Sequence, residues 1–453
     1  MSRGSRQMPA GAGRSEAARG EAARESVSDE TRDPRRDTEG TGSGLLDAAL
    51  TRENLQQAWQ RVKANKGSAG VDGLDIGRTA QHLKMAWPDI RERLLRGTYR
   101  PSPVRRVTIP KPDGGERELG IPTVTDRLIQ QALLQVLQPM LDPTFSEHSY
   151  GFRPGRRAHD AVMAAQAFVV SGRRFVVDVD LEKFFDRVNH DILMDRLRKR
   201  IGDAAILRLI RAYLDAGIMS DGVVAERTRG TPQGGPLSPL LANVLLDEVD
   251  RELERRGHCF ARYADDCNVY VRSLKAGERV MALLRRLYAK LRLTVNETKS
   301  AVASAFGRKF LGFRLLRTAA GAIRLLVADK PLAAFKHRVC RLTQRNAGRS
   351  LAHVIEELRP YLLGWKAYFG MVQQSTLWPA LDRWIRHRLR AIQLKLWKHG
   401  PKAFLALRAL GASYSEARGI AAKMRHWWRA SDGRMNNLLS PAYFDRLGLP
   451  RLS

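Results

Sequence analysis

The sequence has few cysteines and no long apolar run. Its 453 residues include three cysteines (Cys259, Cys267 and Cys340), which form neither a disulfide framework nor a Cys-x-x-Cys zinc pair. No stretch of about 18 apolar residues is present, and the N-terminus lacks the apolar core of a secretory signal. These absences exclude a disulfide-stabilised secreted domain and a bilayer-spanning protein, and they favour a reducing, cytoplasmic compartment.

Acidic residues are scarce relative to basic ones. The chain carries 78 Lys and Arg against 47 Asp and Glu, a formal net charge of +31. Such a surplus indicates a polyanionic partner. A membrane surface is the competing polyanion, but no apolar segment accompanies it, so we expect nucleic acid.

The first 44 residues have almost no large apolar side chains and consist mostly of Gly, Ala, Ser, Arg and Glu. Such a segment cannot bury enough surface to fold. We therefore predict a disordered tail over residues 1–44 and folded sequence from Leu45. The rest of the chain has room for about two to four domains.

Two adjacent carboxylates dominate residues 260–271, Phe-Ala-Arg-Tyr-Ala-Asp-Asp-Cys-Asn-Val-Tyr-Val. Aromatic and β-branched residues predict two short strands joined by a tight turn at Asp265 and Asp266. Two like charges at one turn repel each other, and a divalent cation would offset them. The alternative is an ordinary solvated turn, since Asp is common in turns.

A second acidic segment makes a metal site more plausible than a solvated turn. Residues 175–181 read as an apolar strand that contains Asp178 and Asp180, and strand periodicity places both on the same side. Carboxylates within an apolar strand are costly unless they are paired or coordinated. At this point either residue could be a metal ligand.

Three further segments have less specific patterns. Residues 104–122 predict a hairpin with Lys111 and Arg117 on either side of a Pro-Asp-Gly-Gly turn, suited to binding a triphosphate or else simply exposed. Residues 229–239 hold two glycines between prolines, as a close approach to a ligand or nucleic-acid strand requires. Residues 310–315 read as one strand with a close-packing glycine.

Apolar residues at helical spacing predict most of the remaining elements. The expected helices cover 54–63, 126–141, a segment from 189 to about 201, 240–253, 278–291, 332–345, 352–368, 377–397 and 415–428.

From Val327 to the end there are 23 Lys and Arg against 7 Asp and Glu, with six of the eight tryptophans. We expect most of these aromatics in the core, with Trp365, Tyr368 and Phe369 in one helix–helix seam. Most of the basic face is expected to contact RNA phosphates.

Carboxylates from two separate strands that meet in a sheet could hold two Mg²⁺ ions, which favour oxygen ligands and substrate phosphates. A pair of metal ions supports in-line transfer to a primer hydroxyl. The residues therefore suggest nucleotidyl transfer on a nucleic-acid primer.

Seven segments, in the same order, resemble the sequence blocks of a reverse transcriptase of the group II intron type. They are 65–73 (Asn-Lys-Gly to Val-Asp-Gly), 111–114 (Lys-Pro-Asp-Gly), 119–122 (Leu-Gly-Ile-Pro), 180–186 (Asp-Leu-Glu-Lys-Phe-Phe-Asp), 231–239 (Thr-Pro-Gln-Gly-Gly-Pro-Leu-Ser-Pro), 263–266 (Tyr-Ala-Asp-Asp) and 361–369 (Tyr-Leu-Leu-Gly-Trp-Lys-Ala-Tyr-Phe). The resemblance covers roughly residues 50–450.

This resemblance implies an α+β, right-hand polymerase fold. Fingers and a palm with an antiparallel sheet would span 45–328, a helical thumb or maturase domain 329–400, and a small helical DNA-binding region 401–453.

The resemblance also implies roles for individual residues. It selects Asp180 over Asp178 as a metal ligand and catalytic residue, together with Asp265 and Asp266 and the carbonyl of Leu181. Phe185 takes the position of an aromatic gate against the ribose 2′-hydroxyl. The other implied nucleotide-binding residues are Lys111, Arg117, Gln233, Gly234 and Lys299. The residues expected to bind RNA are Lys366, Arg383, Arg386 and Arg390.

The implied function is RNA-directed DNA polymerase and maturase, acting on its own group II intron RNA during splicing and retrohoming. Its cofactors would be two Mg²⁺ ions, with Mn²⁺ as a substitute, and its partners intron RNA, DNA target or primer, and dNTPs. The expected form is a ribonucleoprotein, monomeric or dimeric, in the bacterial cytoplasm and at the nucleoid when bound to target DNA. The chain ends at Ser453 without a Cys-x-x-Cys and His-rich nuclease domain, so second-strand cleavage is not expected.

Three alternatives remain open. A related reverse transcriptase could serve phage defence or CRISPR adaptation. A viral RNA-dependent RNA polymerase fits less well, because Gly-Asp-Asp is expected at its hairpin. A non-enzymatic RNA-binding splicing factor would not need Asp180, Asp265 and Asp266 intact.

Overall fold

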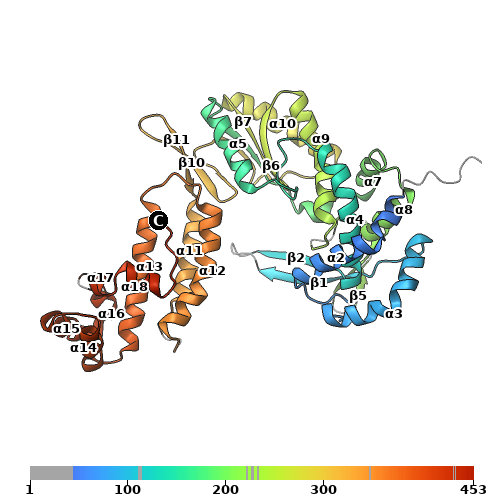
Figure 1. Cartoon of the computed structure of the whole chain (residues 1–453). Helices are drawn as coiled ribbons and strands as arrows, with labels where there is room; N and C mark the ends of the chain where they lie inside the picture. The colour runs from blue at the N-terminus through green and yellow to red at the C-terminus, as the bar shows by residue number, and fades with distance from the viewer. Residues whose placement is uncertain are drawn as a thin grey trace, which may run out of the picture. The chain divides into compact units, whose positions relative to one another are not determined.

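The computed structural model describes residues 44–110, 115–220, 223–225, 229–231, 234–345, 348–431, 433 and 435–453 (Figure 1). Of the tail predicted over 1–44, only Gly44 belongs to this part of the chain. The first described element is α1 (Leu45–Ala49), at the first apolar residues of the sequence. None of the described helices is both long enough and apolar enough to cross a bilayer.

The central sheet, which we call the palm sheet, has four antiparallel strands in the order β6-β7-β3-β8. The strands are β6 (Cys259–Tyr263), β7 (Asp266–Val271), β3 (Phe175–Val179) and β8 (Ala301–Ser304). Residues that pair directly share a face, so Val177 and Val269 lie on one side, and Val176 and Tyr270 on the other. The antiparallel strands predicted at both acidic segments are confirmed.

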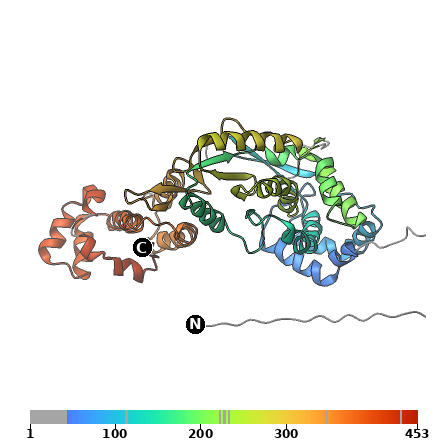
Figure 2. The same ribbon diagram turned by 90° about the horizontal axis from the view of Figure 1, so that it is seen from above.

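Helices pack against both faces of the palm sheet. On one face, α10 (Leu274–Lys290) runs along the strands (Figures 1 and 2), and a Cβ added at Gly277 would lie 2.3 Å from Val302 Cγ1. This glycine therefore permits close approach of helix and sheet. On the other face, α5 (Ala158–Val170) packs through Val162 and Ala165. The sequence predicted that this helix begins at residue 278. It begins four residues earlier, at Leu274, directly after its N-cap residue Ser273.

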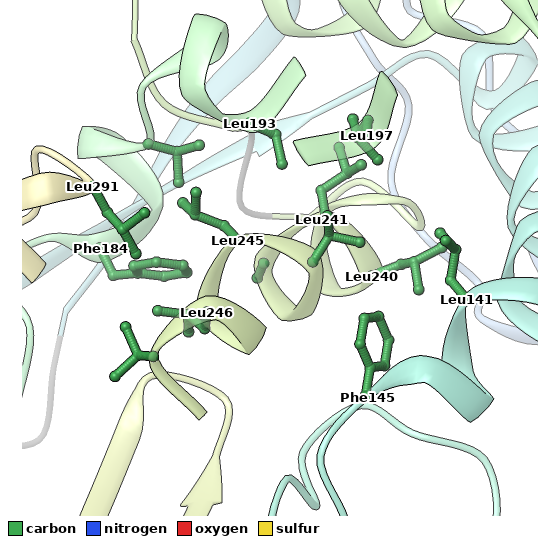
Figure 3. Packing of buried hydrophobic residues seen from close by; sticks show 14 of the residues in the cluster. Leu141, Phe145, Phe184, Leu193, Leu197, Leu240, Leu241, Leu245, Leu246 and Leu291 are labelled. Carbon is green, nitrogen blue, oxygen red and sulfur yellow. The ribbon is translucent and has the colours of Figure 1, made fainter. Parts of the chain in front are cut away.

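The apolar helix α9 (Ser238–Arg255) passes through the main core. Leucines from different sides of α9 meet separate parts of the chain (Figure 3), among them Leu240, Leu241, Leu245 and Leu246 opposite Phe184, Leu193, Leu141 and Phe145. Each buried leucine contributes about 2 kcal/mol of transfer free energy. The first half of α9 is therefore buried nearly all round and has no polar face, whereas its second half has exposed charged residues such as Arg251 and Arg255.

A second sheet, the fingers sheet, has the order β2-β1-β4-β5. The predicted hairpin is present as β1 (Val104–Pro110) and β2 (Glu116–Ile121), while β4 (Ile218–Ser220) pairs parallel to β1 and antiparallel to β5 (Val223–Ala225).

The helices of this part are α2 (Arg52–Ala64), α3 (Ile76–Leu95), α4 (Val124–Leu141), η1 (Asp142–Thr144), α6 (Phe184–Arg187), α7 (His190–Arg198) and α8 (Ala204–Asp215). The helices expected over 54–63, 126–141 and from 189 are confirmed, whereas α3, α5 and α8 were not predicted.

The single strand expected over 310–315 is wrong. The chain reverses there, because β9 (Lys309–Phe310) pairs antiparallel with β10 (Phe313–Arg317), which in turn pairs with β11 (Ile323–Val327). Leu311 and Gly312 both have positive φ, 50° and 83°, as a type I′ turn requires. Gly312 thus permits a turn. The residues on both sides of it favour strands, which is why the sequence predicted one continuous strand.

Helices make up most of the described chain after β11. They are α11 (Asp329–Leu342), α12 (Leu351–Phe369), α13 (Leu377–Leu396), α14 (Gly400–Ala409), α15 (Tyr414–Ala421), η2 (Met424–His426), α16 (Trp427–Ala430), α17 (Met435–Leu438) and α18 (Pro441–Arg446). The three helices expected over 332–345, 352–368 and 377–397 are confirmed within a few residues. The single helix expected over 415–428 is wrong, since the chain breaks after Ala421 into η2 and α16.

The expected aromatic seam is only partly correct. Trp365 of α12 lies 4.2 Å, centroid to centroid, from Phe335 of α11 and 4.8 Å from Phe369. Tyr368 points elsewhere, and its hydroxyl donates to Leu311 O at 2.9 Å. The last part of α12 therefore makes two contacts: Trp365 packs against α11, and Tyr368 bonds to the β9–β10 turn.

Candidate active site

The palm sheet brings the two acidic segments together. In the β3–β7 ladder the last pair is Val179 with Cys267, so the next residues along the two strands, Asp180 and Asp266, face each other. The β6–β7 hairpin closes with the Tyr263–Asp266 pair, which leaves Ala264 and Asp265 as the turn. Opposed residues in antiparallel strands have Cβ atoms about 5 Å apart. Carboxylates 85 or more residues apart in the chain thus converge at one end of the sheet.

The environment of Asp266 reflects the concentration of acids. Burial and then the charges of Asp265, Asp180 and Asp178 together raise the pKa of Asp266 to about 7, while Lys299 opposes the shift. Asp266 is the exposed first residue of β7, where these neighbouring carboxylates add to the effect of burial. The site concentrates negative charge that a cation would stabilise.

Asp178 and Asp180 differ in their partners. Asp178 accepts hydrogen bonds from the Arg308 guanidinium, with Nε at 2.8 Å and Nη2 at 2.6 Å from Oδ2. Asp180 lies 3.5 Å from Lys299 Nζ, a longer and more exposed contact. The carboxylate of Asp178 is therefore held closely by a guanidinium, whereas the contact of Asp180 with an ammonium group is longer.

The backbone around Asp180 is held by the segment that carries Lys299. Asn296 N–H donates to Asp180 O at 2.8 Å, and Asp180 N–H donates to Ser300 Oγ at 3.0 Å. Leu181 forms a bridge with Val295 in which the flanking residues make the hydrogen bonds. In such a pair the carbonyl of Leu181 points away from Val295, toward the side of β3 where β7 lies.

The donor set fits a divalent cation by its chemistry. Carboxylates and a backbone carbonyl are oxygen ligands, which hard divalent ions prefer. Within the described ranges, no three acidic, His or Cys side chains are already arranged as a metal-ligand set.

A buried arginine holds the turn and was missed from the sequence. Arg262 is fully buried, its Nε lies 2.8 Å from Asp250 Oδ1, and its Nη1 donates to Ala264 O at 2.8 Å. Ala264 has a φ of 59°, which costs a non-glycine residue about 1 kcal/mol or more. The alternation of side chains along a strand places Arg262 on the same face as buried Phe260. A charged residue at a position that should face the core could have indicated a buried ion pair from the sequence.

Gly151 is a second residue that the prediction missed. A Cβ added there would lie 2.3 Å from Ala264 N, so the loop that contains Gly151 passes directly against the acidic turn. Asn243 of α9 donates to Gly151 O at 2.9 Å and also accepts from Arg262 Nη1 at 3.0 Å. The turn is thus positioned by α9 and this loop together.

The structure describes some of the expected nucleotide-binding residues but not all of them. Thr231 N–H donates to Phe185 O at 2.7 Å, which joins the Gly-Gly segment to α6. Gly234 has a φ of 131°, and an added Cβ would lie 2.9 Å from Gly120 O of β2. Phe185 packs edge-on to Phe184 with centroids 5.1 Å apart and keeps one side partly exposed. Lys111 and Gln233 lie outside the described residues, as does the side chain of Arg117.

The four residues expected to bind RNA have different environments. Arg383 is exposed and Arg386 is half-buried on α13. Lys366 lies 4.0 Å from the Trp378 ring centroid and donates to Leu452 O. Arg390 is only 3% exposed, and its Nε donates to Leu439 O at 3.0 Å. The expectation that Arg390 contacts RNA is wrong, because its guanidinium is used inside the protein.

Comparison with known families agrees with this arrangement. Residues 109–315 match the family described as reverse transcriptase (RNA-dependent DNA polymerase), and residues 332–410 match the group II intron, maturase-specific domain.

Individual relatives cover different shares of the chain. It is 33% identical over 316 residues to protein YkfC of Escherichia coli (strain K12), covering 60% of this chain and 83% of the relative. It is 38% identical over 198 residues to the group II intron-encoded protein LtrA of Lactococcus lactis subsp. cremoris, covering 43% of this chain and 32% of the relative. Thus it spans most of YkfC but about a third of LtrA.

Among solved structures, the chain is similar to one in a partial Cas6-RT-Cas1–Cas2 complex, with 28% identity and a TM-score of 0.36 over 55% of this chain and 42% of that one. The two family matches cover the palm sheet with its convergent acids and the helices that follow it. A divalent metal ion is the general cofactor of this chemistry. The chain belongs to the reverse transcriptases that carry a group II intron maturase-specific domain.

Proposed function

We propose that this chain is an RNA-directed DNA polymerase that extends a DNA primer with dNTPs, and a maturase that binds and copies its own group II intron RNA. The observation that carries the polymerase proposal is the strand register that places Asp180 opposite Asp266, beside Asp265. This register joins carboxylates from two separate segments at the end of one sheet. The match to the maturase-specific domain supports the second role.

In this proposal Asp180 and Asp265 hold two Mg²⁺ ions, which Mn²⁺ can replace, with Asp266 beside them and the carbonyl of Leu181 as a further ligand. Metal ions held there would supply activation of the primer hydroxyl and stabilisation of the leaving pyrophosphate. Arg262 holds the Ala264 carbonyl and thereby fixes the position of Asp265. Arg308 keeps Asp178 out of the ligand set.

Lys299 has two proposed roles. Its ammonium group neutralises Asp180, whose Oδ2 lies 3.5 Å from Nζ. Lys299 would also contact the triphosphate, together with Lys111 and Arg117. Phe185 excludes the ribose 2′-hydroxyl, and Gln233 and Gly234 line the nucleotide and template.

The maturase role assigns intron RNA to the exposed basic surface of the helical region, with Arg383, Arg386 and Lys366 as contacts. Residues 401–453 are assigned to the DNA target. The match over residues 332–410 favours intron RNA over a role in phage defence or CRISPR adaptation. The presence of all three acids at one end of the sheet favours an active enzyme over a non-enzymatic splicing factor.

The test of this proposal is primer extension on an RNA template with Asp265→Asn. Loss of a metal ligand should abolish extension while RNA binding stays nearly unchanged, because no phosphate contact is removed. Asp160→Asn, at the start of α5, provides a matched control that should retain extension. Wild-type rates in Asp265→Asn would show that the site is assigned incorrectly.

A further inference from the structure

A basic hollow lies at the end of the β6–β7 hairpin opposite the acidic turn. Its volume is about 620 Å³, and residues from five segments line it. These are the turn after α9, the start of β6, the end of β7 with Arg272 after it, α10 from Ala276 to Arg286, and the loop before β3. The charged side chains that line the hollow are Arg173, Arg256, Arg272, Arg279 and Arg286, with His258 beside them. Among the residues that the structure describes, none with an acidic side chain lines it.

Most of these guanidinium groups lack an acidic partner. Arg256 is paired with Glu252, with Nε 2.6 Å from Oε1, and Arg173 donates to the Ser171 hydroxyl at 2.7 Å. Arg272, Arg279 and Arg286 are exposed, and no described carboxylate forms an ion pair with them. The local charge is therefore positive and largely uncompensated within the described part of the chain.

The size of the hollow determines how strongly these charges interact. A sphere of 620 Å³ is about 11 Å across, close to the Debye length of about 8–10 Å at physiological salt. The guanidinium groups are thus near enough to repel one another through solvent, and a bound anion would relieve that repulsion.

The shape and the residue types favour a nucleic-acid backbone over a bilayer. Arginine binds phosphate through paired N–H donors, which lysine does not offer. The floor contains Ala276, Val280 and Leu283, against which arginine stems can pack while their charged ends stay in water. A concave site of this width receives a protruding backbone turn, as in folded RNA, and does not match a flat membrane surface.

We propose that this hollow binds the phosphate backbone of structured RNA, at a site separate from the active site. The choice of RNA rests on the proposed maturase function. From Asp266 to Arg272 there are six residues of extended chain, which corresponds to about 20 Å. RNA bound at the hollow is therefore held apart from the template–primer contacts at the acids, so that one RNA can be anchored at one place and copied at another.

The experiment compares two charge-matched double variants on α10. Arg279→Gln/Arg286→Gln removes two lining arginines that lie seven residues apart on one helical face. Lys275→Gln/Lys290→Gln removes the same charge from the same helix at exposed residues outside the hollow. Binding of a folded group II intron transcript to the full chain is measured across salt concentrations, with duplex DNA of equal phosphate number as a second ligand.

We expect the arginine variant to bind the RNA about 10- to 30-fold more weakly at 0.1 M salt, with the salt slope reduced by about 1.4. The lysine variant should lose less than half of that. Equal losses in the two variants would show general attraction and overturn the proposal. A loss confined to duplex DNA would assign the hollow to the DNA target and also overturn it.

Arg279→Lys/Arg286→Lys separates geometry from charge. Since lysine retains the charge but not the paired donors, this variant should recover the salt slope and only part of the affinity. Primer extension on a short template, which cannot span about 20 Å beyond the acids, tests the proposed polymerase independently. If extension fails in the wild-type chain while the arginine variant still weakens RNA binding, the polymerase proposal fails and the RNA site stands.

Discussion

The two ends of the β6–β7 hairpin have opposite charge. One end carries Asp265 and Asp266 opposite Asp180, and the other is surrounded by the arginines of the basic hollow. Both ends use the same two strands, and the same pair of helices, α9 and α10, packs nearby. The ends therefore attract ligands of opposite charge: the acidic end attracts cations and the basic end attracts anions.

This comparison shows how the fold separates opposite charges over a short distance. The acids come from strand ends that the ladder brings together, and their backbone is held by a fully buried ion pair, Arg262 with Asp250. The arginines come mostly from an exposed helix face and from loops. We expect substitutions at the acidic end to affect catalysis and stability, and those at the basic end to affect binding alone.

The largest effect should distinguish Asp178 of β3 from Asp180, the residue directly after that strand. Asp180→Asn should reduce primer extension by about 10³-fold or more, because charge stabilisation by a metal ion is worth several kcal/mol. Asp178→Asn should reduce it far less, since Arg308 already neutralises that residue. Single-turnover extension rates for both variants test this, and equal losses would show that Asp178 shares the metal.

The next effect concerns the buried pair behind the acidic turn. Asp250→Ala leaves the Arg262 charge buried without its partner, and should lower the free energy of unfolding by about 3–5 kcal/mol. Urea denaturation measures the loss, and Glu252→Ala on the same helix, in an exposed ion pair, should change it little.

A double variant distinguishes stability from positioning. Asp250→Leu/Arg262→Met should recover most of the lost stability, because apolar side chains replace the buried pair. It should still extend primers slowly, since nothing then holds Ala264 O. Full activity in this variant would show that Arg262 contributes only to folding.

A smaller effect is the pH dependence of the acidic end. Asp266 has a pKa of about 7 in the folded, metal-free protein, above the ordinary value of about 4 for the unfolded chain. Between these values the folded state binds more protons, so this group makes stability fall as pH rises from about 4 to 7. Added divalent metal should make this loss of stability smaller, because a metal ion would displace the proton from Asp266. Thermal unfolding across this range, with Asp266→Asn as the control, should show the difference.

The smallest effect tests whether arginines far from the hairpin act as single phosphate contacts. Arg383→Gln should reduce the salt slope of RNA binding by about 0.7, as expected for one contact. Arg390→Gln should leave the slope unchanged and lower stability, because its guanidinium bonds to Leu439 O inside the protein. A change of slope in Arg390→Gln would mean that the buried side chain becomes accessible in the complex.

The sequence predicted much of the palm and less of its surroundings. Strand residues around Asp180 and Asp265 identified both strands, since period-two patterns depend on local backbone geometry. The turn at Leu311 and Gly312 was missed because its flanking residues are good strand formers. Arg262 and Gly151 were missed because their roles depend on contacts with Asp250 and Ala264, which local patterns do not reveal.

By itself the sequence determined the residue types of the site, the presence of acids in two strand-like segments, the apolar first half of α9 and the basic excess. Only the tertiary structure decided that Asp180 faces Asp266, that Asp178 belongs to Arg308, and that Arg390 is buried while Arg279 and Arg286 line a hollow. The physical reason is that composition and periodicity are local, whereas strand register and the burial of a helix face are set by packing between segments far apart in the chain.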